Sequence, residues 1–223
     1  MDRIRCFELR DAGSIPAGPS KHTLNKVMQH EFTNILWMPI DIPKCPIQPT
    51  VTSGNFWAWW EFNKLTQQRT NPYDESDWAD ETKEKYPEFV EWFKHFPYKN
   101  LRNVKVNRQV KAVEPHIDFH RPDLHPILHS NNNENEPCGY RILINGNRNK
   151  GLYVMRGKEK IYCDIPDDTD TYVLGHTSTM HGVDDDDNRI TIFTHFEIDA
   201  EKNKTLLQKS FEKYGSYAIR STL

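Results

Sequence analysis

The sequence predicts a mainly β protein, a sandwich or a barrel with a few flanking helices. Two regions carry this prediction. Between residues 140 and 175, short apolar runs are separated by turns of Gly, Asn, Asp and Lys, and residues 190–198 form the last strongly apolar run. Short, closely spaced strands without intervening helices are typical of sandwiches and barrels rather than of βαβ sheets.

The length of 223 residues suits a single domain, residues 1–223, that can bury a sizeable core. We divide it into an aromatic-rich layer of strands and helices at 1–99, a β core at 100–198, and a C-terminal helix and tail at 199–223. No internal repeat or linker interrupts the chain.

The N-terminal layer is expected to contain strands at 4–9 and 35–40 and a helix at 24–32. Residues 56–62 hold three tryptophans and two phenylalanines, the densest aromatic cluster of the chain. These rings could wall a substrate pocket, but we prefer the interpretation that they pack a helical or extended layer onto the sheet.

A helix is predicted from Asp80 to Phe96. Phe89, Trp92, Phe93 and Phe96 recur at helical spacing, and acidic residues stand at the start, where the helix dipole favours them. The sequence therefore predicts one amphipathic helix with an aromatic face.

The β core begins where the hydrophobic period changes from helical to alternating, at residues 101–120, with a turn or bulge expected near Gln109. Further strands are predicted at 140–145, 152–156, 160–165, 171–175 and 190–198. In the last of these, Thr191, Phe193 and His195 share the face of Arg189. Residues 200–214 are predicted to form a terminal helix.

Charge and cysteine content narrow the classes of function. The formal net charge is -3, without a large basic block, which does not favour a nucleic-acid surface. The four cysteines, Cys6, Cys45, Cys138 and Cys163, contain no C-x-x-C pair and indicate neither a zinc site nor a disulfide framework. Without a signal peptide or an apolar span, we expect a cytoplasmic protein that does not enter a membrane; its oligomeric state is open.

Three residues predict a metal centre. His116 and Asp118 are two positions apart in an extended segment, so their side chains point the same way, about 7 Å apart. His181, which is distant in the sequence, would be the third ligand. The ion would then be bound on one side by two imidazoles and one carboxylate. This arrangement suits ferrous iron in non-haem oxygenases.

A cation close beyond His181 adds to the pattern. Arg189 precedes the last strand, and its planar fork can pair with a carboxylate through two parallel hydrogen bonds. Thr191 shares its face and could add a hydroxyl donor. Arg141 is the alternative cation for the same carboxylate.

The ordered set His116-Ile117-Asp118, His181 and Arg189-Ile190-Thr191 resembles the Fe(II)/2-oxoglutarate-dependent oxygenases, nearest to the aspartyl/asparaginyl β-hydroxylase and prolyl hydroxylase relatives. The resemblance covers roughly residues 100–198. It implies a double-stranded β-helix, or jelly roll, as the catalytic core, Fe(II), O2 and 2-oxoglutarate as co-substrate, and hydroxylation of a C–H bond with release of succinate and CO2.

Several points stay open. His120 is a rival ligand, and residues 119–137 form a long loop that we expect to act as a lid. A cupin-like metal enzyme of another reaction type, or a non-catalytic metal-binding jelly roll, are the alternative functions. The substrate is not identified by the sequence, and peptide side chains, amino acids and other small molecules all remain candidates.

Overall fold

The computed structural model describes residues 32, 34–49, 57–61, 63–65, 76–109, 111–117, 139–175, 179–184 and 189–221. The predicted strand at 4–9, nearly all of the predicted helix at 24–32, and the predicted lid at 119–137 lie outside these residues. So do Asp118 and His120.

Thirteen strands in the described residues form two sheets with antiparallel pairing. The larger sheet has the order β13-β1-β10-β7-β12-β5-β4-β3, with β2 also paired to β5, and the smaller sheet has the order β6-β11-β8-β9. The larger sheet consists of β1 (Ile35–Pro39), β2 (Trp57–Glu61), β3 (Asn63–Leu65), β4 (Ser76–Trp78), β5 (Tyr98–Gln109), β7 (Gly139–Asn145), β10 (Thr171–Leu174), β12 (Arg189–Ile198) and β13 (Ile219–Arg220). The smaller sheet consists of β6 (Val113–His116), β8 (Leu152–Arg156), β9 (Glu159–Tyr162) and β11 (His181–Val183).

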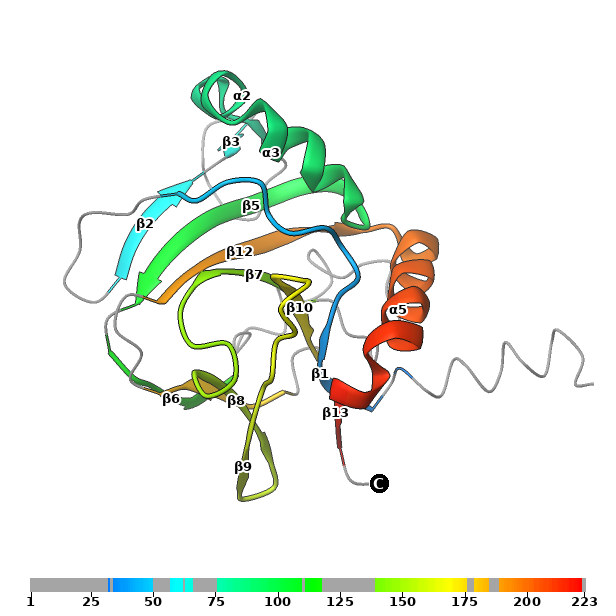
Figure 1. The fold of residues 1–223 in the computed structure, drawn as a ribbon. Coiled ribbons are helices and arrows are strands. Elements are labelled where there is room, and N and C mark those ends of the chain that lie inside the picture. Colours follow the sequence, from blue (N-terminus) through cyan, green and yellow to red (C-terminus); the bar gives the residue numbers. More distant parts are fainter. Residues whose placement is uncertain are drawn as a thin grey trace, which may run out of the picture.

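The eight consecutive strands β5 to β12 are wound as a jelly roll. The first pairs with the last, the second with the seventh, the third with the sixth, and the fourth with the fifth. This nested pairing divides the eight strands between two facing sheets, and Figure 1 shows β6 and β8 beneath the curved sheet of β5, β12 and β7. The predicted mainly β jelly-roll fold is confirmed.

The helices whose bounds lie in the described residues are α2 (Asp80–Lys85), α3 (Pro87–Trp92), the 3-10 turns η1 (Phe93–His95) and η2 (Gly215–Tyr217), and α5 (Ala200–Tyr214). The prediction of one helix from Asp80 to Phe96 was wrong, because Pro87 disfavours helical backbone at Tyr86, which has φ -136 and ψ 53. The predicted terminal helix is confirmed, and the Asp199 side chain caps it by accepting from the Lys202 amide. No helix in the described part of the chain is long and apolar enough to cross a membrane.

The aromatic cluster at 56–62 contributes a strand to the sheet. β2 pairs with β5 from Trp57 opposite Gln109 to Glu61 opposite Lys105. The expected layer packed onto the sheet is therefore corrected to an additional strand at its side. The other predicted strands of the core are confirmed, although the one expected at 160–165 ends at Tyr162.

One face of the larger sheet packs against α3, η1 and α5, as Figure 1 shows, and we call this the helix-side core. Its aromatic centre is Phe93, whose ring lies 4.6 Å from that of Phe96 and 5.0 Å from that of Trp78. Aromatic pairs at such distances add to the stabilisation from buried area. The sheet contributes Val104, Val106, Tyr140, Ile142, Val173, Ile192, Phe196 and Ile198.

The opposite face of the larger sheet looks toward the smaller sheet, and we call it the inner face. Part of it forms a second apolar cluster with the smaller sheet, made of Trp37, Leu143, Leu152, Val154, Cys163, Ile165, Tyr172, Leu174, Val183 and Ile219. The rest of the inner face is polar but buried, with Asn103, Asn107 and Gln109 on β5, Arg141 on β7, and Arg189 and Thr191 on β12. Buried polar side chains of this kind direct attention to the inner face as the candidate site.

Candidate metal centre

His116 and His181 come from distant parts of the chain and lie directly opposite each other. His116 ends β6 and His181 begins β11, and the two residues are register partners in the antiparallel pair. Their ring centroids are 4.6 Å apart with an interplanar angle of 46°. His181 is buried, with 7% of its surface exposed, and His116 is half-buried.

Both rings point to the inner side of the smaller sheet. His181 is two residues from Val183, which packs in the apolar cluster between the sheets, so both side chains are on the same face of β11. On β6, three positions separate Val113 from His116, while two separate their partners Val183 and His181. This irregularity in register turns His116 to the same face as Val113, an effect typical of a β-bulge.

Hydrogen bonds fix the proton of each imidazole. His116 Nδ1 lies 2.9 Å from the carbonyl of Glu114, and His181 Nδ1 lies 3.1 Å from the carbonyl of Thr179. Because a carbonyl oxygen only accepts, each Nδ1 carries a hydrogen, and in the neutral ring this leaves the lone pair on Nε2. Histidines that bind metals are oriented in this way by backbone carbonyls.

The spacing of the two rings suits a shared metal ion. Two imidazoles bound at right angles, through nitrogens about 2.1 Å from the ion, have ring centres roughly 4.5 Å apart. The described residues contain no group of three His, Cys, Asp or Glu side chains that could hold an ion, and the predicted third ligand, Asp118, lies outside them. The described residues therefore supply two of the three predicted ligands.

Gly182 allows the close approach of the strands next to the histidines. A Cβ atom at this position would lie 2.3 Å from the Tyr153 hydroxyl oxygen and 2.6 Å from the carbonyl oxygen of Val113. Tyr153 is the register partner of Gly182 on β8, and its ring crosses the glycine. A residue with a side chain would clash at position 182, which explains why glycine follows His181. The sequence alone did not predict this requirement.

Arg189 begins β12 and is buried, with 2% of its surface exposed. Its guanidinium lies beside the Tyr172 hydroxyl, and its Nη1 lies 3.5 Å from the carbonyl of Asn147. Burial raises the pKa of Tyr172, and the positive charges of Arg189 and Arg141 only partly oppose this. The Tyr172 hydroxyl therefore stays neutral at physiological pH and can hold the guanidinium in place.

Thr191 and Arg141 are also on the inner face. Thr191 is 5% exposed, two residues beyond Arg189 on the same side of β12. Arg141 is 2% exposed and is the register partner of Phe193, so it lies four residues along the sheet from Arg189. All three predicted co-substrate residues are thus buried on the face that looks toward the histidines, at different heights.

Sequence reasoning missed the buried amides of β5. Gln109, Asn107 and Asn103 are the register partners of Arg189, Thr191 and His195, so they extend the polar part of the inner face by one strand. The signal was present in the sequence, because these polar residues alternate with Val104 and Val106. Polar residues at alternate positions of a central strand indicate a buried face with a role in binding or catalysis in addition to packing.

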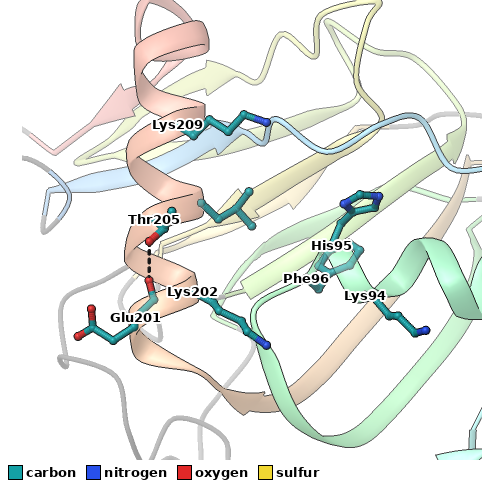
Figure 2. A pocket seen from close by; sticks show the side chains of 8 residues that line it. Lys94, His95, Phe96, Glu201, Lys202, Thr205 and Lys209 are labelled. Carbon is teal, nitrogen blue, oxygen red and sulfur yellow. Dashed lines mark hydrogen bonds between the residues drawn. The ribbon is translucent and has the colours of Figure 1, made fainter.

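A separate groove of about 370 Å³ lies on the outside of the roll, between η1 and the start of α5 (Figure 2). Phe96 is among its lining residues, and Lys94, Lys202 and Lys209 stand around it. Each lysine has a carboxylate neighbour: Glu91 at 2.5 Å, Asp199 at 3.9 Å and Asp41 at 2.8 Å, respectively. This groove is lined by none of the predicted site residues, and its charges are balanced locally.

Comparisons with known proteins add little to this geometry. No protein-family model matches the chain, and no curated protein matches its sequence. Among solved structures, the chain is similar to an oxidoreductase of the 2OG-Fe(II) oxygenase family from Burkholderia pseudomallei, with 10% sequence identity and a TM-score of 0.34 over 81% of this chain and 82% of that one. A likeness at this level does not establish a shared function.

Proposed function

We propose that this protein is an Fe(II)- and 2-oxoglutarate-dependent oxygenase that hydroxylates a C–H bond of its substrate. In this proposal His116, Asp118 and His181 hold the iron, and Arg189 with Thr191 holds the far carboxylate of 2-oxoglutarate. Iron, 2-oxoglutarate and dioxygen together supply the oxidising chemistry, in which 2-oxoglutarate becomes succinate and CO2 and one oxygen atom enters the substrate.

The observation that carries the proposal is the pair of histidines across β6 and β11. Two imidazoles from segments 65 residues apart are register partners, have ring centroids 4.6 Å apart, and both carry the Nε2 lone pair. A pair of surface or core histidines has no reason to share a tautomer, a face and a spacing that suit one ion. The sequence places a carboxylate, Asp118, two residues beyond His116.

The residues of the chain would act mainly by positioning. The carbonyls of Glu114 and Thr179 prevent the imidazoles from rotating, so the ligands are preorganised. Arg189 would bind a carboxylate with its two-pronged fork, and the Tyr172 hydroxyl would keep that fork in place. Because Arg189 is buried, its attraction for a carboxylate is stronger than it would be in water.

The direct test adds Fe(II) and then 2-oxoglutarate to the metal-free protein without oxygen and records the visible spectrum. We expect a charge-transfer absorption that requires both components, and succinate release once oxygen is admitted. Asp118→Ala should abolish both signals, because it removes the anionic ligand. Asp164→Ala changes an exposed carboxylate elsewhere in the chain and should leave both signals intact.

Three results would reject the proposal. Folded protein that shows neither the absorption nor succinate would contradict it, and so would full turnover by Asp118→Ala. Binding of a metal by a protein that shows no binding of 2-oxoglutarate would instead favour a cupin-like metal enzyme or a non-catalytic metal-binding jelly roll.

A further inference from the structure

Two buried asparagines of β5, Asn103 and Asn107, lie on the inner face of the larger sheet. Asn103 is 6% exposed and Asn107 is 3% exposed. Every residue from Asn103 to Asn107 has a consecutive register partner on β12, from His195 to Thr191, so this stretch of β5 is a regular strand. The two amides therefore point to the same side of β5, four residues or about 13 Å apart along the strand.

The amide oxygens of these two residues are unpaired. The Oδ1 atom of each is buried and has no hydrogen-bond partner among the described residues. Buried amides in folded proteins are nearly always paired, and an unpaired one is costly. Asn203 on α5 shows the usual situation, because it is 0% exposed and its Oδ1 accepts from the Tyr140 hydroxyl at 2.6 Å. The two asparagines of β5 thus differ from a structural asparagine of the same protein and indicate a place for a ligand.

The chemistry of an amide oxygen decides which ligand can pair with it. Oδ1 only accepts, so its partner must present an N–H or O–H group. At neutral pH both carboxylates of 2-oxoglutarate are ionised, and the molecule then offers acceptors alone. The co-substrate therefore does not satisfy Asn103 or Asn107, and in the proposed oxygenase the remaining ligand is the substrate.

The spacing of the two amides selects the kind of substrate. One residue of extended chain spans only about 3.3–3.6 Å, so a single amino acid does not reach from one amide to the other. In an extended peptide, N–H groups four residues apart point to the same side and are about 13 Å apart, as the two asparagines are. Lys105 between the amides, and its register partner Phe193 on β12, are only half-buried, so this part of the inner face is accessible.

We propose that the substrate is an extended peptide segment of at least five residues, whose backbone N–H groups donate to the Oδ1 atoms of Asn103 and Asn107. This inference rests on the proposed function and names the substrate class of the same site. Arg189 and Thr191 on β12 hold the co-substrate, and the two amides of the neighbouring strand β5 hold the peptide along the sheet. Free amino acids do not span both amides.

The test is affinity selection by the complex with Fe(II) and 2-oxoglutarate, without oxygen, followed by ultrafiltration and mass spectrometry. One probe set is a library of N-acetylated, C-amidated hexapeptides, and the other is the set of single N-acetyl amino acid amides. We expect at least one hexapeptide to be retained, and every single-residue amide to bind at least about tenfold more weakly, because it meets one asparagine at most.

Replacing each N–H of the retained hexapeptide by N-methyl, one position at a time, locates the donors. We expect two positions, four residues apart, at which methylation weakens binding by about fivefold to a hundredfold, because a buried acceptor then loses its donor. Methylation at the other positions should have smaller effects.

Variants then assign each N–H group to one asparagine. Asn103→Ala should abolish the cost of methylation at one of the two positions, and Asn107→Ala should abolish it at the other, while the titrations with iron and 2-oxoglutarate stay unchanged. The control is Asn100→Ala, because Asn100 is also on β5 but its side chain donates to Glu197 at 3.0 Å. This variant should keep the cost at both positions.

Stability gives a readout that needs no peptide. In the metal-free protein, Asn103→Leu and Asn107→Leu replace an unpaired amide with an apolar side chain of similar size, so the denaturation midpoint should stay unchanged or rise. Asn203→Leu should lower the midpoint, because it removes the acceptor of the buried Tyr140 hydroxyl. A drop in both β5 variants as large as that in Asn203→Leu would show that the two amides are paired within the fold and would overturn the inference.

Binding results can also overturn it. They would do so if no hexapeptide were retained while iron and 2-oxoglutarate bind normally, if single-residue amides bound as tightly as hexapeptides, or if the methylation costs persisted in both alanine variants. Failure of iron and 2-oxoglutarate to bind would instead remove the proposed function. The same selection without them then decides the peptide site. Retention of hexapeptides that depends on Asn103 and Asn107 would keep it, and no such retention would overturn it.

Discussion

The two faces of the larger sheet come from the same strands and have opposite characters. On β12, Ile192 and Phe196 point into the helix-side core, whereas Arg189 and Thr191 lie on the inner face. On β5, valines alternate with asparagines in the same way. Neighbouring residues of one strand point to opposite faces of the sheet, so one residue can pack in the apolar core while the next lies in the candidate site.

The separation has an energetic logic. Burying arginine and amide groups costs free energy unless each is well paired, so the inner face adds less to stability than an apolar face of the same area. The helix-side core offsets this with densely packed rings, in which Phe93 contacts Trp78, Phe89, Phe96, Tyr98 and Phe196. Substitutions on the two faces should therefore affect different measurements.

The largest effect is expected in the helix-side core. Phe93→Ala should lower the free energy of unfolding by about 3–5 kcal/mol, because Phe93 is fully buried and its removal leaves a cavity among aromatic rings. Denaturant unfolding measures the change. Iron affinity, measured where the variant is still folded, should remain close to that of the original protein. A loss of iron affinity in the folded variant would show that the two faces are not separate.

Gly182→Ala should affect both stability and iron binding, because Gly182 follows His181 on β11 and lies against Tyr153 and the carbonyl of Val113. The added Cβ meets the backbone oxygen of Val113 at 2.6 Å, and backbone cannot move aside cheaply. We expect a loss of about 1–3 kcal/mol in unfolding free energy, and weaker iron binding although Gly182 is no ligand. Gly157→Ala is the control for adding a methyl group, since open space surrounds that Cβ position, although its φ of +64 carries some strain of its own. If Gly182→Ala bound iron normally, the strand spacing would not matter to the site.

On the inner face, Arg189 should affect binding more than stability. Arg189→Lys keeps the charge without the two-pronged geometry, and Arg189→Ala removes both. Affinity for 2-oxoglutarate should fall in the order original, Lys, Ala, with a loss of roughly tenfold to more than a hundredfold for Ala, while iron binding hardly changes. An unchanged 2-oxoglutarate titration in Arg189→Ala would make Arg141 the holder of the co-substrate.

The smallest effect concerns the ion pairs of the half-buried Asp41 with the exposed Lys209 and Lys213. Burial raises the pKa of Asp41, but hydrogen bonds and charges from Lys209 and Lys213 outweigh this and lower it overall. A lowered pKa contributes stability above pH of about 4 that is lost as the pH falls further. Asp41→Asn should therefore cost less than about 1 kcal/mol at pH 7 and almost nothing near pH 2. An equal cost at both values would show that the effect is not electrostatic.

Much of the fold could be predicted because strand alternation and turn residues are local signals. The strand at 152–156 and the helix at 200–214 agree with the structure residue for residue. The helix at 80–96 was predicted wrongly because the helical aromatic spacing after Tyr86 was joined to the acidic start at Asp80, while Pro87 breaks the helical backbone between the two parts. The pairing of β2 with β5 depends on contacts about 50 residues apart, which no local pattern records.

For the candidate site, the residues themselves could be chosen from the sequence, but the neighbouring residues that hold them in position could not. The order of His116, His181 and Arg189 in the sequence suggested a site, but the irregular register that turns His116 inward depends on the partner strand. The contact of Tyr172 with Arg189 and the fit of Tyr153 over Gly182 are likewise three-dimensional. The metal role of His116, Asp118 and His181 remains a prediction.

Iron binding by histidine variants tests the central claim most directly. Metal-free protein is titrated with Fe(II) without oxygen, and bound iron is measured in the original protein, His116→Ala, His181→Ala and His95→Ala, the last an exposed histidine next to the outer groove. We predict one tightly bound iron per chain in the original and in His95→Ala, and a large loss of affinity in the other two. Equal iron binding by all four proteins would contradict the account.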